Sequence, residues 1–123
     1  MKVSADKVAV MIMSICLSIG ASTHILDNIN FGFLPYRFAP QWMNFYWTSL
    51  GLLDLFAVLL LIKYRKAGVL LTFLIMISDV YVNSLAYYSL NIIIDPIALQ
   101  LQTLFLGFCV GSSLWLWNRS ESV

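Results

Sequence analysis

Long, nearly uninterrupted apolar stretches dominate the pattern of hydrophobic and polar positions. They cover about residues 8–26, 44–62, 67–90 and 97–117. Each has the roughly 20 residues that a helix needs to cross a bilayer. None has the polar, solvent-facing side that a helix of a soluble domain shows. The pattern therefore predicts an all-α, polytopic membrane protein, a four-helix transmembrane bundle that forms a single domain over residues 1–123.

The connections between these spans differ in length. Residues 28–42 form the only long one, in which Gly32, Pro35 and Pro40 interrupt a run of aromatic side chains. Aromatic residues with polar tips prefer the headgroup zone, so we expect this segment to lie along the membrane surface, as an apolar linker or as a lid over an outward-facing cavity. Residues 63–66 and 91–96 are predicted to be short turns, and Pro96 suits the first turn of the fourth span.

Composition and charge support a membrane location. Hydrophobic residues make up 61% of the chain and charged residues 11%, with a net charge of +1. With the N-terminus inside, Arg37 alone among the basic residues is external, and the positive-inside rule then predicts an N-in/C-in topology. The basic residues on the cytoplasmic side are Lys2, Lys7, Lys63, Arg65, Lys66 and Arg119. We expect a multi-pass protein of a cell membrane, such as a bacterial inner membrane, with membrane lipid around it and no nucleic acid as partner.

The start of the chain also admits a second interpretation. A basic beginning, an apolar centre and small residues near Gly20 are typical of a cleaved signal peptide. Asp6 weakens the basic beginning, so an uncleaved first span is preferred. Cys16 and Cys109 lie in different spans with no metal-binding pattern around them, and we expect two buried thiols, no metal site and no cofactor.

Two aspartates lie deep within apolar spans. Asp54 belongs to the second and Asp79 to the third. A carboxylate inside a membrane is costly, and two close together cannot both ionise cheaply, so one is expected to hold a proton. Such a pair can carry a proton, bind an amine or ammonium ligand, or act in acid–base chemistry. The structural alternative is that neighbouring hydroxyls and amides satisfy both side chains, which then only set the helix register.

Other polar residues share helical faces with the aspartates. Thr72, Met76, Asp79 and Asn83 recur at intervals of three and four, which places them on one side of a helix. The same spacing groups Trp47, Gly51 and Asp54 in the second span. It also groups Gly20, His24 and Asp27 in the first span, and Gln100, Thr103, Gly107 and Gly111 in the fourth. The predicted ligand-binding residues are Asp54, Asp79, Asn83, His24, Asp27, Gln100 and Thr103.

Small residues recur at intervals of four in two spans. They are Ser14, Ser18 and Ser22 in the first span, and Gly107 and Gly111 in the fourth. Such stripes let helix backbones approach closely in lipid. We interpret both as packing surfaces within the bundle rather than as a dimer interface.

The arrangement resembles the four-span EXPERA proteins, which include sterol isomerases and the sigma-2 receptor. The likeness rests on His24 and Asp27 at the end of the first span, Asp54 in the second and the aromatic connection between them. The resemblance implies binding of hydrophobic amines or sterols by acidic residues in such places, and it is one of arrangement, with no residue role carried over. In size and span number the chain also resembles small multidrug transporters, although it lacks their glutamate in the first span.

Three classes of function follow. The first hypothesis is a protein that binds or transports a small amphipathic or cationic ligand in an outward-facing polar cavity, with or without a proton. The second is a non-catalytic interaction protein, such as a complex subunit, an assembly partner in a homodimer or larger complex, or a toxin-immunity protein. An intramembrane enzyme is the least favoured of the three classes, because the sequence shows no nucleophile and no set of metal ligands.

Overall fold

The computed structural model describes residues 4–92 and 96–120, with the backbone alone for 118–120. The described residues form helices and no strand: α1 (Ala5–Phe31), α2 (Gln41–Lys63), α3 (Arg65–Ser84), the π-helical turn η1 (Leu85–Ser89) and α4 (Pro96–Ser120). Each of the four long helices, with η1 as an extension of α3, is long and apolar enough to cross a membrane. The predicted all-α fold of four span-length helices is confirmed, and it fits a small multi-pass membrane protein. The N-in/C-in orientation stays a prediction.

The connection between α1 and α2 is shorter than predicted. The prediction of a connection over residues 28–42 is wrong in extent, because α1 continues to Phe31 and α2 begins at Gln41. Asn28 and Asn30 are polar but compatible with a helix, and α1 ends only at Phe31, where Gly32 forms the cap with a φ of 101° that suits glycine. We call residues 32–40 the linker.

The turn between α2 and α3 is tight. It lies at Tyr64, within the basic segment where a turn was predicted. Gly68 makes this turn possible, because a Cβ there would overlap the backbone of Leu60 and Leu61. Helix α4 begins at Pro96, as predicted. The predicted turn over residues 91–96 includes residues 93–95, which lie outside the described part of the chain.

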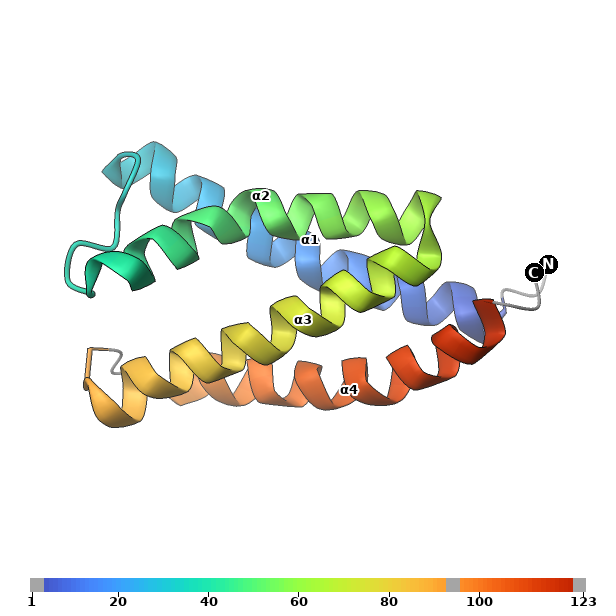
Figure 1. The fold of residues 1–123 in the computed structure, drawn as a ribbon. Helices are drawn as coiled ribbons and strands as arrows, with labels where there is room; N and C mark the ends of the chain where they lie inside the picture. Colours follow the sequence, from blue (N-terminus) through green and yellow to red (C-terminus); the bar gives the residue numbers. More distant parts are fainter. Residues whose placement is uncertain (1–3, 93–95, 121–123) are drawn as a thin grey trace.

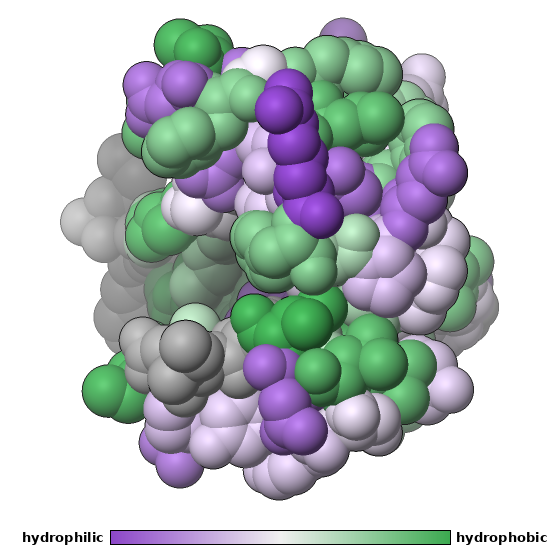
Figure 2. Space-filling model, turned by 90° about the vertical axis from the view of Figure 1, so that its left-hand side faces the viewer, coloured by the Kyte–Doolittle hydropathy of each residue, from purple (hydrophilic) through white to green (hydrophobic). Residues whose placement is uncertain are grey.

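Consecutive helices pack against each other, α1 on α2, α2 on α3 and α3 on α4, as Figure 1 shows. The helices α1 and α4 meet where α1 begins and α4 ends. There the Trp115 indole donates a hydrogen bond of 2.8 Å to Asp6, and Arg65 lies 3.8 Å from the same carboxylate. We call this the basic end, and the opposite one the linker end. Figure 2 looks onto the linker end, where polar and apolar side chains intermingle.

The bundle is apolar inside and outside. Met13, Leu50 and Leu116 are among the buried core side chains, while large apolar side chains such as Leu52 and Leu104 are more than 70% exposed on the outer faces. In water such a surface would be unfavourable, whereas in lipid it carries no penalty. The exposed apolar faces therefore agree with the membrane location.

The small-residue stripe of α4 lies on the outside of the bundle, so the prediction that it packs within the bundle is wrong. The serine stripe of α1 is half-buried at Ser14 and Ser18 and exposed at Ser22. A Cβ at Gly107 or Gly111 would have no atom within 4 Å. Ser14, Ser18 and Ser22 line a shallow groove formed entirely by residues of α1. The reason is the rotation of each helix: the buried stripe of α4 runs through Leu99, Cys109, Ser113 and Leu116 instead.

Candidate functional site

Both span-embedded aspartates face the interior. Asp54 of α2 and Asp79 of α3 are only 6% and 8% exposed, and they are close enough for their charges to interact. This agrees with the predicted orientation away from lipid. Neither carboxylate has an ion-pair partner among the described residues. The ion pair of Arg65 with Asp6 lies far away, at the basic end.

Side-chain amides surround Asp79. Asn83, one helical turn further on, donates a hydrogen bond of 3.3 Å to Asp79 Oδ1, and Gln102 of α4 donates one of 3.3 Å to Asp79 Oδ2. The two amides also join each other, from Asn83 Nδ2 to Gln102 Oε1 at 2.6 Å. The Trp47 indole of α2 donates to Asn83 Oδ1 at 2.7 Å. This network ties α2, α3 and α4 together through polar groups.

The glutamine of this network is Gln102, not Gln100. Gln100 is exposed, and the Thr103 hydroxyl is used in a bond to the Leu99 carbonyl of its own helix. The predicted convergence of Gln100 and Thr103 with the aspartates is therefore wrong. It assumed that Gly107 and Gly111 mark the inner face of α4, whereas they mark the outer one. The sequence gives no signal for Gln102, because α4 is apolar on nearly every side and only the structure shows that its buried stripe includes Leu99 and Cys109.

Asp54 has surroundings of another kind. Its Oδ1 is fully buried and has no hydrogen-bond partner. Its Oδ2 faces Gly20 of α1, where a Cβ would come within 2.8 Å of that oxygen. Glycine at position 20 thus leaves room for the carboxylate. The site holds a buried acceptor whose partner is missing, next to a helix position without a side chain.

A second polar cluster lies at the linker end and is built around Tyr36. The Tyr36 hydroxyl donates to Asp27 Oδ2 at 2.7 Å and lies 2.8 Å from His24 Nδ1. Because a hydroxyl has one hydrogen, which goes to Asp27, the His24 Nδ1 donates to Tyr36. Burial and the neighbouring Asp27 raise the pKa of Tyr36. The cluster brings together His24 and Asp27, as predicted from their spacing.

Asn44 and Trp47 attach the linker to α2. Asn44 Oδ1 accepts a bond of 3.0 Å from the Tyr36 backbone N–H, and its amide donates to the Leu34 carbonyl at 3.3 Å. The Trp47 ring packs edge-on against the Tyr36 ring at 5.4 Å between centroids. Since Trp47 also donates to Asn83, it connects the two polar clusters. Neither Tyr36 nor Asn44 was predicted, because contacts between a linker and a helix leave no periodic signal in the sequence.

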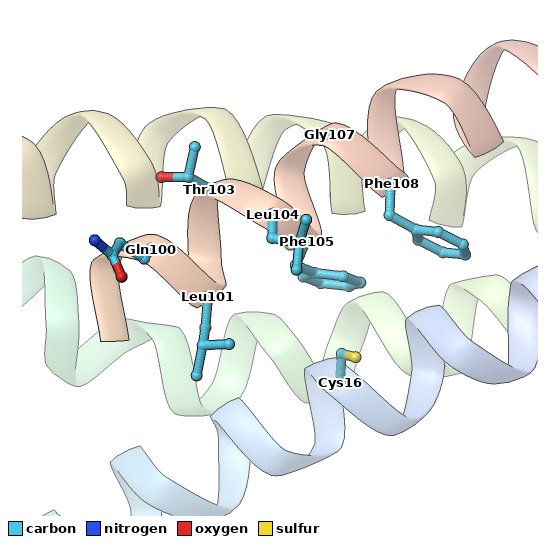
Figure 3. Close-up of a pocket in the computed structure, with 8 residues that line it drawn as sticks. All are labelled: Cys16, Gln100, Leu101, Thr103, Leu104, Phe105, Gly107 and Phe108. Atoms are coloured by element: carbon cyan, nitrogen blue, oxygen red, sulfur yellow. The ribbon is translucent and has the colours of Figure 1, made fainter. Parts of the chain in front are cut away.

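The structure has an open groove between two helices and a smaller pocket. The groove, of about 880 Å³, lies between α1 and α4, and Figure 3 shows Leu101 and Phe105 of α4 directed toward α1, which carries Cys16. Gln100 and Thr103 line this groove, and no residue of the two polar clusters does. A smaller pocket of about 390 Å³ lies at the linker end, beside Asp27 and Tyr36.

The described residues contain no group of three or more His, Cys, Asp or Glu side chains that could hold a metal ion. Comparisons with protein-family models, curated proteins and solved structures gave no match. The interpretation of the two clusters therefore depends on their geometry alone.

Proposed function

We propose that this membrane protein binds or transports a small cationic or amphipathic ligand, with Asp54 and Asp79 as its charged core. The observation that carries the proposal is the Asp54 Oδ1 atom, which is buried without a hydrogen-bond partner. An unpaired carboxylate inside a membrane is costly unless a proton or a cation neutralises it. The site thus suits an exchange in which a cationic group replaces a proton.

The two carboxylates have different roles in this proposal. Asp79 is held by the amides of Asn83 and Gln102, so its position is set by the bundle. Asp54 has no such partner and is the group that takes the proton or the cation. Hydrogen bonds lead from Asp79 through Asn83 to Trp47, whose ring packs edge-on against Tyr36, and this direction supports access from the linker end.

Binding of a primary alkylamine and of tetraphenylphosphonium to the purified protein in nanodiscs tests the proposal. We expect Asp54→Asn to lower the number of ligands bound per protein, because the core site is lost, while the protein remains folded, since asparagine fits the same space. Gln100→Leu is the matched control on the outside of α4 and is expected to bind as the wild type does. Unchanged binding by Asp54→Asn and Asp79→Asn would refute the proposal.

A second candidate, a non-catalytic interaction protein, is favoured by one observation. Gly107 and Gly111 lie one turn apart on the outer face of α4, with open space where a side chain would be. In lipid such a pair allows another helix to approach closely. Energy transfer between two labelled copies in liposomes tests for self-association, and Gly107→Ile is expected to abolish it. An unchanged signal in that variant would count against this candidate.

A further inference from the structure

The pocket at the linker end combines one carboxylate with aromatic walls. Its volume of about 390 Å³ lies within the range of about 300–1,000 Å³ that small-molecule sites occupy. The lining residues are Asp27 and Phe31 of α1 and Pro35, Tyr36 and Phe38 of the linker. The pocket lies at the bundle end, beyond the buried aspartates.

Asp27 supplies negative charge to this pocket without a counter-ion. One of its oxygens accepts the Tyr36 hydroxyl hydrogen, and no described residue forms an ion pair with it. Arg37, next to Tyr36 in the chain, is exposed and makes no ion pair with Asp27. Asp27 also lies near the C-terminus of α1, where the helix dipole adds partial negative charge. The pocket therefore attracts a cation.

Aromatic rings determine which kind of cation fits. The Tyr36 and Phe38 rings stand at 89° to each other with centroids 6.3 Å apart, and so form two adjoining walls. Phe31 and Phe38 remain 67% and 61% exposed, so their faces are free to contact a ligand. Aromatic faces attract organic ammonium groups by cation–π interaction. Inorganic cations such as Ca²⁺ need six or more oxygen ligands, which a single carboxylate and one hydroxyl do not supply.

We propose that this pocket binds an organic ammonium group, with Asp27 as the counter-ion and Tyr36, Phe38 and Phe31 as the aromatic walls. The group belongs to a soluble amine or to a phospholipid headgroup, since both present the same chemistry at the membrane surface. This site is separate from the proposed core site at Asp54, and it does not depend on that site.

The experiment measures choline and tetramethylammonium binding by calorimetry, with the full chain in nanodiscs of phosphatidylglycerol. We expect Asp27→Asn and Phe38→Ala each to weaken binding by about tenfold. Phe33→Ala is the matched control, because Phe33 is an exposed linker aromatic outside the pocket, and it should bind as the wild type does. Asp27→Asn should weaken choline binding by the same factor in an Asp54→Asn background, in which the core site is absent. Failure of one proposed site can therefore be told apart from failure of the other.

A second arm identifies the source of the ammonium group. Nanodiscs that also contain phosphatidylcholine or phosphatidylethanolamine should compete with choline if the natural occupant is a lipid headgroup. Absence of competition assigns the pocket to a soluble amine. The proposal is overturned if the wild type binds neither ammonium compound and no headgroup, or if Asp27→Asn and Phe38→Ala, shown by circular dichroism to be folded, bind as tightly as the wild type.

Discussion

Asp54 and Asp79 are equally buried on adjacent helices, yet their surroundings are opposite in kind. Asp79 receives hydrogen bonds from two side-chain amides, one from its own helix and one from α4. Asp54 faces a glycine of α1 and has a buried oxygen without a partner. The same residue type thus has its hydrogen bonds made in the network between α3 and α4, but lacks a hydrogen-bond partner in the site between α1 and α2. Depth alone therefore does not identify a binding residue, whereas an unmet hydrogen-bonding requirement points to one.

The largest expected effect concerns the amides around Asp79. Replacing Gln102 with leucine removes its bonds to Asp79 and Asn83, and we expect a loss of about 1.5–3 kcal/mol in the free energy of unfolding, the usual value for a bond to a charged group. Unfolding in mixed detergent micelles measures it. Gln100→Leu, on the exposed face of the same helix, should change stability by less than about 0.5 kcal/mol. Equal effects at the two positions would contradict the assigned rotation of α4.

A direct comparison of the two aspartates comes next. We expect Asp79→Leu to be about 1–2 kcal/mol more destabilising than Asp54→Leu, because only the former removes the acceptor of hydrogen bonds from the Asn83 and Gln102 amides. The same unfolding measurement applies to both variants. If Asp54→Leu proves as costly as Asp79→Leu, Asp54 has a structural partner, and the proposed binding role loses its basis.

The linker is expected to contribute less to the free energy of unfolding than the network around Asp79 does. Tyr36→Phe removes the hydroxyl between His24 and Asp27, and we expect a loss of about 1 kcal/mol. Tyr88→Phe, an exposed tyrosine near the same end, is the control and should be neutral. An unaltered melting temperature in Tyr36→Phe would show that the linker cluster adds no stability.

An effect of the same size tests the contact of Gly20 with Asp54. A methyl group at position 20 would lie 2.8 Å from Asp54 Oδ2, so Gly20→Ala should cost about 1 kcal/mol by overpacking. Gly107→Ala, at an open position, should cost nothing. Adding Asp54→Ala to Gly20→Ala should restore stability if the carboxylate is the group that clashes. Additive losses in the double variant would place the clash elsewhere.

The residues of α2 and α3 allowed the most accurate prediction. Asp54, Asp79 and Asn83 lie on faces whose other members, such as Trp47 and Thr72, are also buried. These helices have neighbours on both sides, so most of their polar residues must turn inward to escape lipid. Span number and the inward aspartates therefore followed from the apolar pattern, because lipid on the outside leaves a carboxylate only the interior.

The sequence did not determine the rotation of α4 or the position of Tyr36. Helix α4 packs mainly on α3 and is apolar on nearly every side, so hydrophobicity alone does not distinguish the face with Gln102 from the face with Gln100 and Thr103. Only contact with Asp79 and Asn83 selects Gln102. Tyr36 lies in a segment without helical periodicity, and its bonds to His24 and Asp27 cross nine or more positions of the chain. Lipid exposure is a property of each residue and can be inferred from the sequence, whereas a polar pairing between elements depends on their relative placement and was decided only by the tertiary structure.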